Sequence, residues 1–289
     1  MQTLEKISDR FWYLTPVSET DRPILGVVIG DKRSLMIDAG NSENHAKYFL
    51  NELEINKIPQ PSLVVLTHWH WDHSFGLSAL DMISVASKQT KTEIEKQVPF
   101  EWTDVALDER VQSGVEIEFC ANVIKEEYGR ERNIRITLPE ITFEAMMQID
   151  LGGVTCQLQH VGGDHAQDSV IVYVKEEKIL FLGDSIYANI YSSKRNHTVK
   201  RTLELLDMID LYDAETYILS HWRPVSKLEY QQEAALLRDI ARLTEQFTGR
   251  YEAIVKAYKA QVERELNEDE LETIEYFING YELDGGIIG

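Results

Sequence analysis

The chain of 289 residues has few basic side chains and only two cysteines. It carries 29 Lys and Arg against 49 Asp and Glu, a formal net charge of −20. Nucleic-acid binding relies on clustered Lys and Arg. We therefore expect no nucleic-acid partner, and the charge also disfavours an anionic membrane surface. Cys120 and Cys156 are far apart, without a Cys-x-x-Cys pair, and we expect two buried thiols rather than a disulfide framework.

Long apolar runs are also missing. No stretch approaches the roughly 20 residues that span a bilayer, and the opening MQTLEKISDR lacks the basic start and apolar core of a signal peptide. We expect a cytoplasmic protein with no membrane partner. Hydrophobic residues make up 43% and charged residues 27% of the chain, which fits a globular protein of one large or two small domains.

Strand signals dominate the first 70 residues. Short apolar runs bounded by Gly, Pro and Asp occupy residues 11–14, 24–30 and 34–40. Residues 44–57 show apolar side chains near helical spacing, and residues 61–68 (PSLVVLTH) are typical of a buried strand. This order predicts an open α/β sheet, which binds ligands at the carboxyl ends of its strands.

A second strand-rich block follows a segment, residues 74–132, whose helical composition predicts a cover over the site. Gly152-Gly153 and Glu176-Glu177 indicate hairpin turns. A helix is expected at residues 198–212 and a last strand at residues 215–222. The strands expected in the second block are residues 133–138, 141–153, 154–161, 168–174 and 178–184.

The C-terminal part, from Ser226 onward, has a helical pattern. Apolar residues repeat at intervals of three and four and continue past Gly249. We expect a main domain of residues 1–225 and a helical extension of residues 226–289 packed on it. The same apolar stripe could instead form a homodimer contact or a lid. It consists of Leu236, Ile240, Leu243, Phe247, Tyr251, Ile254, Tyr258 and Val262.

Three of the eight histidines fall within HWHWDH, residues 68–73, directly after an apolar run. Imidazole and carboxylate ligands suit zinc, and also iron or manganese. In an extended segment His68 and His70 point to the same side, whereas Asp72 and His73 face a neighbouring position. This spacing indicates a metal site whose other ligands come from elsewhere in the chain.

Further segments also place a His or Asp at the end of an apolar run: GGDHAQDS, FLGDS and LSHW. Each alone is a weak signal, because an Asp at a strand end is commonly a turn or cap residue. Together they complete a set of candidate metal ligands. The set is His68, His70, Asp72, His73, His165, Asp184 and His221.

The order of these four motifs resembles the metallo-β-lactamase-fold superfamily of hydrolases, over roughly residues 20–225. An Asp rather than a Cys at position 184 is similar to the glyoxalase II-like, lactonase-like and tRNA-processing nuclease branches. The family usually has Gly-His-Thr-Pro-Gly-Ser where this chain has residues 164–169. Asp168 therefore replaces a glycine, which alters the loop without removing His165.

The resemblance implies an α/β fold, an αββα sandwich of two mixed β-sheets flanked by helices, with two divalent metal ions. By position, His68, His70 and His165 would hold one ion, and Asp72, His73 and His221 the other, with Asp184 bridging them. Asp72 would also orient a hydroxide, and Tyr187 could hydrogen-bond the substrate carbonyl, as a tyrosine at this offset does in lactone hydrolases.

The expected function is hydrolysis of a small-molecule ester, thioester or lactone by a metal-bridging hydroxide. Bound metal lowers the pKa of water from about 15.7 towards 7. A phosphodiesterase or nuclease is the first alternative, which the acidic charge disfavours, and a β-lactam hydrolase is another. A di-iron redox protein and an inactive binding module are weaker alternatives, because no flavin-binding domain is appended and every ligand position is filled.

The other histidines and three tryptophans match no ligand position. We expect His45, His160 and His197 at the surface or behind the ligands. The tryptophans flank ligands, so we expect them to pack around the site and keep it dry, or to line an apolar pocket. They are Trp69, Trp71 and Trp222.

Overall fold

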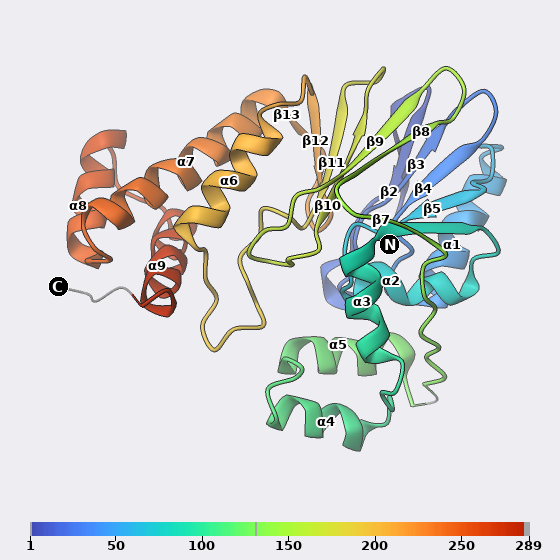
Figure 1. Ribbon diagram of the computed structural model, residues 1–289, viewed down its shortest axis with the longest axis horizontal. Coiled ribbons are helices and arrows are strands. Elements are labelled where there is room, and N and C mark those ends of the chain that lie inside the picture. Colours follow the sequence, from blue (N-terminus) through green and yellow to red (C-terminus); the bar gives the residue numbers. More distant parts are fainter. Residues whose placement is uncertain (1, 131, 286–289) are drawn as a thin grey trace.

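The computed structural model describes residues 2–130 and 132–285, which form two β-sheets packed face to face (Figure 1). The first sheet runs in the order β1-β2-β3-β4-β5-β6-β7. Strands β1 to β4 pair antiparallel, and β4 to β7 pair parallel. The strands are β1 (Leu4–Ser8), β2 (Phe11–Leu14), β3 (Leu25–Ile29), β4 (Ser34–Ile37), β5 (Leu63–Val65), β6 (Ile83–Ser87) and β7 (Ile141–Phe143).

The second sheet runs in the order β13-β12-β11-β10-β9-β8. Its pairs are antiparallel except for β11 and β12, which are parallel, with Gly183 opposite Leu219. The residues just after both strands therefore meet at one edge. The strands are β8 (Met146–Asp150), β9 (Thr155–His160), β10 (Val170–Val174), β11 (Ile179–Gly183), β12 (Thr216–Leu219) and β13 (Val225–Ser226).

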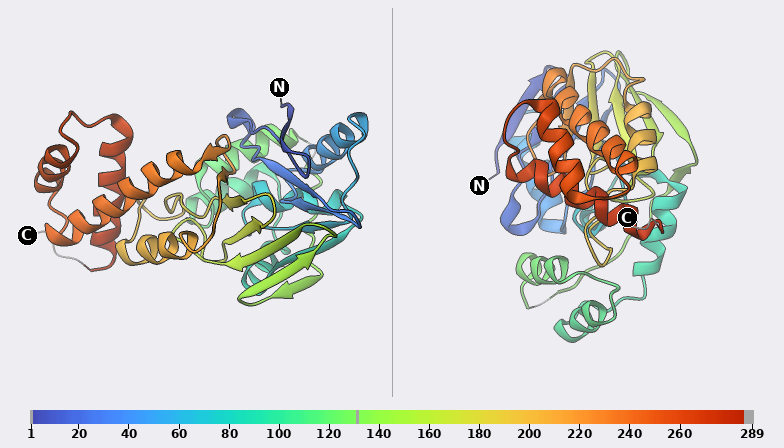
Figure 2. Two further views of the ribbon diagram at one scale, coloured as in Figure 1. Left: turned by 90° about the horizontal axis from the view of Figure 1, so that it is seen from above. Right: turned by 90° about the vertical axis from the view of Figure 1, so that its left-hand side faces the viewer.

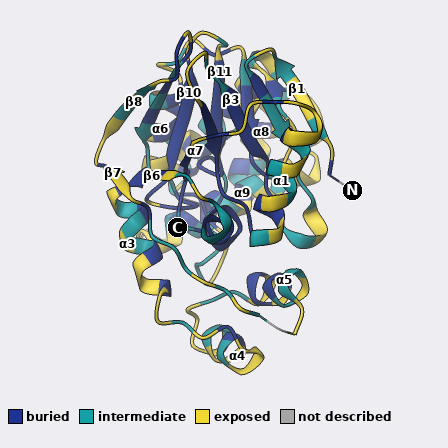
Figure 3. Cartoon of the chain, turned by 90° about the vertical axis from the view of Figure 1, so that its right-hand side faces the viewer, coloured by how far each residue is buried: buried dark blue, intermediate teal, exposed yellow. Residues whose placement is uncertain are grey.

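The main core lies between the sheets. Phe11 and Ile37 of the first sheet belong to one buried cluster with Phe181 and Ile218 of the second, and the sheet interior is the most buried part of the molecule (Figure 3). Side chains alternate across a strand, so a sheet with apolar residues on both faces needs a further layer on each side.

Helices supply these outer layers. Helix α1 (Glu43–Ile55) is capped by the Ser42 side chain and packs Phe49 and Leu53 on the first sheet. Helices α6 (Val199–Ile209) and α7 (Lys227–Gln246) cover the second sheet. The predicted αββα sandwich of two mixed sheets is confirmed.

The C-terminal helices extend away from the second sheet (Figure 2). Helix α7 begins at a capping box of Ser226 and Glu229. It ends before Thr248 and Gly249, both of which have positive φ, and the chain reverses there. Helices α8 (Tyr251–Val262) and α9 (Glu268–Leu283) follow and share the apolar cluster of α6 and α7. The predicted helical extension is therefore present over the described residues, while 286–289 lie outside them.

The segment predicted as a cover, residues 74–132, is a cover only in part, because it also contains β6, a strand inside the first sheet; residue 131 lies outside the described residues. Short helix α2 (Trp71–Ser74) and a 3-10 helix (Phe75–Ala79) lead into β6, and α3 (Lys88–Gln97) follows it. Helices α4 (Asp104–Gln112) and α5 (Glu118–Tyr128) pack on Trp71 and Phe75, below the sheets in Figure 1. No helix of the described residues is long and apolar enough to cross a membrane.

Some strand predictions are wrong. Residues 133–138 form no strand, because β6 pairs with β7 instead, while Ile136 and Leu138 lie on irregular backbone with their side chains partly buried. Residues 141–153 divide into β7 and β8, which belong to different sheets. The sequence pattern missed β1, whose side chains are largely polar, and β6, which contains small residues.

Candidate metal centre

The HWHWDH segment follows β5 at the carboxyl edge of the first sheet. Leu66 still donates its N–H to the carbonyl of Val85, and the chain then leaves the sheet. His68 and His70 lie in the loop, and Asp72 and His73 lie in the first turn of α2. All four side chains are buried, although each is polar or charged. Burial of such groups is costly unless a partner compensates for it.

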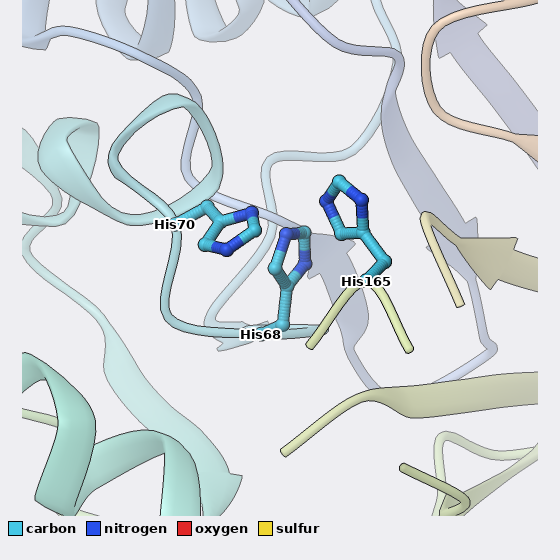
Figure 4. Close-up of side chains that lie close together, drawn as sticks. All are labelled: His68, His70 and His165. Atoms are coloured by element: carbon cyan, nitrogen blue, oxygen red, sulfur yellow. The ribbon is translucent and has the colours of Figure 1, made fainter. Parts of the chain in front are cut away.

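The two sheets bring the remaining candidates to the same place. His165 lies in the loop before β10, Asp184 directly follows β11, and His221 follows β12. Figure 4 shows His68, His70 and His165 with their rings turned towards one another. Their ligand atoms lie within 4.8 Å of one another. A second group with the same spacing consists of Asp72, His73, Asp184 and His221.

Asp184 lies between the two groups. Its Oδ2 atom is 3.4 Å from Nε2 of His165 in the first group. The same oxygen is 3.4 Å from Nε2 of His73 and 3.2 Å from Nε2 of His221 in the second group. A carboxylate at this position is within reach of both groups, as the bridging role that the family resemblance implies for Asp184 requires.

The spacing of the second group fits a divalent cation. Asp72 Oδ2 is 3.0 Å from Nε2 of His73 and 3.1 Å from Nε2 of His221. Ligands about 2.0 Å from a tetrahedral ion lie about 3.3 Å apart, so these separations suit atoms around one ion.

Unsatisfied atoms support the same interpretation for the first group. Among the described residues, Nε2 of His68, His70 and His165 and Oδ1 of Asp184 are buried without a hydrogen-bond partner. Buried polar atoms of this kind are rare in proteins unless water or an ion satisfies them. The donor set is therefore compatible with divalent metal binding.

Electrostatics distinguishes the two groups. Burial holds the pKa of His68 and His70 well below the usual value, so both rings are neutral and keep a lone pair for a metal. For His73 and His221, burial lowers the pKa, but the nearby carboxylates outweigh it and raise the pKa well above the usual value. A metal ion at the second group would displace these protons.

Contacts behind the ligands orient their rings. His73 Nδ1 lies 2.8 Å from Asp38 Oδ2, and this carboxylate also accepts from Thr67 N and Thr67 Oγ1. Since the Thr67 hydroxyl proton goes to Asp38, its oxygen can accept from Nδ1 of His68 at 3.1 Å. His165 Nδ1 donates to the Ala188 carbonyl at 3.1 Å. Each of these three rings therefore presents Nε2 to the centre. In known metal sites, partners on the other ring nitrogen orient ligating histidines in the same way.

Several residues around the site were missed by the sequence analysis. Asp38 is buried at a positive φ of 61°. Asp21 lies 3.5 Å from His221 Nδ1, and burial and Asp72 raise its pKa to about 7. Tyr191 contacts the His70 ring at a centroid distance of 5.1 Å. Asp38 carries one weak signal, its place at the end of an apolar run, whereas Asp21 and Tyr191 match no motif.

A pocket of about 330 Å³ opens onto the candidate ligands. Tyr187, the predicted carbonyl-binding residue, lines it and lies between the rings of His165 and His221, at centroid distances of 6.1 and 6.4 Å. Much of the remaining wall is apolar or aromatic and includes Trp71 and Phe119.

The structure agrees with some of the expectations for the other histidines and the tryptophans and differs from others. His45 and His197 are buried rather than superficial, and His45 lies near Gln2, whose amide is 3.2 Å from its Nε2. Trp71 packs beside the site as expected. Trp222 is 60% exposed and does not pack around the site, but it lines a neighbouring pocket with Tyr187, which is the alternative expectation. Cys120 and Cys156 are both buried free thiols, as expected.

Comparison with known proteins identifies the family. The family model described as "Metallo-beta-lactamase superfamily" matches residues 20–221. The chain belongs to this superfamily. Together with the clustered His and Asp side chains, this membership supports a metal-dependent hydrolase.

Two curated relatives are similar to this chain at low sequence identity. The acyl-coenzyme A thioesterase MBLAC2 of Gallus gallus is 26% identical over 215 residues, covering 68% of this chain and 73% of the relative. The Homo sapiens protein of that name is 25% identical over 214 residues, with the same coverage. This similarity supports a hydrolase without fixing the substrate.

Solved structures confirm the fold. A metallo-beta-lactamase from Pontibacter korlensis superposes with a TM-score of 0.57 at 19% identity, over 81% of this chain and 98% of the other. The sec-alkylsulfatase Pisa1 from Pseudomonas sp. gives 0.65 at 16% identity, over 97% of this chain and 49% of that one.

Proposed function

We propose that this metallo-beta-lactamase superfamily member hydrolyses a carbonyl ester, thioester or lactone of a small molecule, with thioesters the first class to test. The observation that carries the proposal is the position of Asp184 between two groups of ligands at the floor of a largely apolar pocket. The named activity of the MBLAC2 relatives favours a thioester.

The first group would hold one divalent ion through His68, His70 and His165, and the second would hold another through Asp72, His73 and His221. Asp184 would contribute to both. Zinc suits these nitrogen and oxygen ligands, and iron or manganese is an alternative. When bound, such ions polarise a carbonyl oxygen and make a water molecule nucleophilic near neutral pH.

Asp72 and Tyr187 would assist with protons. Asp72 lines the pocket, where its carboxylate can accept a hydrogen bond from the attacking water and pass the proton to the leaving group. Burial and the Asp184 charge raise the pKa of Tyr187 above its usual value. Tyr187 therefore keeps its proton at neutral pH and can donate it in a hydrogen bond to the developing oxyanion.

A substrate panel tests this proposal. Purified protein is supplied with Zn, Mn or Fe in turn and assayed on chromogenic esters, acyl thioesters, lactones, a cephalosporin and bis(p-nitrophenyl) phosphate. We expect turnover of the carbonyl compounds, led by thioesters, and none of the phosphodiester. Cleavage of the phosphodiester alone would overturn the carbonyl assignment and favour the nuclease alternative.

A further inference from the structure

The loop between β11 and α6, residues 184–198, lies against the C-terminal helix α9. It begins at Asp184 and supplies Tyr187, Tyr191 and Arg195 to the wall of the pocket. Tyr276 of α9 lines the same pocket. The C-terminal extension is therefore part of the wall around the candidate metal centre rather than a remote appendage.

Several contacts fix this loop on α9. The N–H of His197 donates to the Tyr276 carbonyl at 3.0 Å, and the Asn279 side chain donates to the carbonyl of Arg195 at 2.9 Å. Gly280 lets the two backbones meet, because a Cβ atom there would lie 2.0 Å from the carbonyl oxygen of His197.

The far end of the loop is tied to the metal site. Asp164, next to His165, accepts hydrogen bonds from Thr198 N and Thr198 Oγ1, both at 2.8 Å. Within the loop, Asn189 and Asn196 form an isolated antiparallel bridge. The backbone that carries Arg195 is thus held at both ends and against α9.

The charge of Arg195 stands out in these surroundings. Among the described residues that line the pocket, Arg195 is the only Lys or Arg, and three Asp residues, Asp21, Asp72 and Asp184, line the same pocket. In the described part of the chain no carboxylate forms an ion pair with Arg195, whereas the adjacent Lys194 pairs with Glu282 at 3.0 Å. The Arg195 side chain lies against the Tyr276 hydroxyl, and a guanidinium that no carboxylate neutralises suits a carboxylate or phosphate oxygen.

We propose that Arg195, held in place by Asn279 and Gly280 of α9, binds an anionic group of the substrate while the scissile carbonyl lies at the metal centre. The inference rests on the proposed hydrolysis and names its substrate class, which is an ester or thioester with a carboxylate or phosphate at a distance from the reacting bond. Arg195 is the binding residue, and Asn279 and Gly280 are positioning residues.

Paired substrates test the inference and locate the anion. The p-nitrophenyl hemiester of glutaric acid against p-nitrophenyl butyrate tests an anion on the acyl side. Acetyl-coenzyme A against S-acetyl pantetheine tests a phosphate on the thiol side. We expect wild type to prefer the anionic member of one pair, and Arg195→Gln to reduce that preference about 10-fold through KM, the usual size for a lost charge-assisted hydrogen bond.

Asn279→Ala and Gly280→Ala should lower the same preference, and Asn279→Ala is the informative variant if Gly280→Ala unfolds. Lys194→Gln is the matched control, because it removes an equal charge one position away and should leave the preference at the wild-type value. A purely structural role for α9 would reduce kcat for both members of a pair equally and would overturn the inference.

Binding of inert analogues separates this inference from the proposed function. Calorimetry on metal-loaded protein compares S-methyl coenzyme A with S-methyl pantetheine, and glutaramate with butanamide. Weaker binding of an anionic analogue to Arg195→Gln supports the inference even if no ester is turned over. The absence of turnover would contradict only the hydrolase assignment. Equal binding of every analogue to wild type and Arg195→Gln would overturn the anion site while leaving ester hydrolysis intact.

Discussion

The Asp38→Asn substitution tests how the protein prepares His73 for a metal ion. Asp38 Oδ1 accepts from Thr67 N at 2.7 Å, and Oδ2 accepts from Thr67 Oγ1 at 2.9 Å and lies 2.8 Å from His73 Nδ1. In the variant the amide oxygen stays on Thr67 N, which leaves the amide N–H group facing His73. The ring must then carry its proton on Nε2, which removes the lone pair that faces the centre.

The size of the expected loss in metal affinity follows from the contribution of residues that hydrogen-bond to a metal ligand. Loss of a carboxylate behind a ligating histidine weakens metal binding by roughly 10- to 100-fold, about 1.4 to 2.7 kcal/mol. Asn tolerates the positive φ of 61° at this position, so backbone strain adds little. We expect the zinc affinity of the second group to fall by that factor, measured by competition with a chromophoric chelator.

Asp31→Asn serves as the control. Asp31 is exposed and pairs with Arg10 at 2.7 Å in the turn between β3 and β4, far along the strands from the site. This variant should bind zinc as wild type does. Wild-type zinc affinity in Asp38→Asn would refute the reasoning that Asp38 sets the His73 tautomer.

Two further predictions concern Asp168 and Tyr187. Burial raises the pKa of Asp168 to about 7, so folding becomes less favourable as pH rises from about 4 to 7, where the unfolded chain ionises and the folded chain does not. Asp168→Asn should remove this pH dependence of the unfolding free energy, which is worth up to about 4 kcal/mol at 1.36 kcal/mol per pKa unit. Denaturant unfolding at pH 5 and pH 8 measures the difference in stability. An unchanged pH dependence in the variant would contradict the prediction. Tyr187→Phe should slow turnover roughly 10- to 100-fold with unchanged metal content, through loss of one oxyanion donor; an unaltered rate would mean that Tyr187 only packs against the ligands.

Six of the seven candidate ligands could be predicted because they follow an apolar run that becomes a buried strand, whereas His165 lies in the loop before β10. HWHWDH follows β5, Asp184 follows β11, and His221 follows β12. Carboxyl ends of parallel strands gather at one edge, so a short local pattern carries long-range information. The sequence pattern does not show the register in which neighbouring strands pair. The pairing of Gly183 with Leu219 brings Asp184 and His221 together, and it depends on packing across the whole sheet.

The sequence analysis missed site residues outside the motifs because their positions also depend on strand pairing and packing. Asp38 reaches His73 only because β4 lies parallel to β5, with Ile37 opposite Val65. Arg195 is one of 29 Lys and Arg residues and belongs to no motif, and only the docking of its loop on α9 gives it a place in the pocket. Likewise three of the five residues of β6 are Ser or Ala, so its apolar run is short, and its strand conformation follows from parallel neighbours on both sides.

The central claim is that the two groups of side chains hold divalent cations with Asp184 shared between them. Elemental analysis of protein purified without chelators, combined with anomalous diffraction at the metal edge, measures this most directly. We expect about two ions per chain in wild type, one at each group, and loss of at least one in Asp184→Ala. Metal-free wild-type protein that takes up no added zinc, or Asp184→Ala with the full complement of ions, would contradict it.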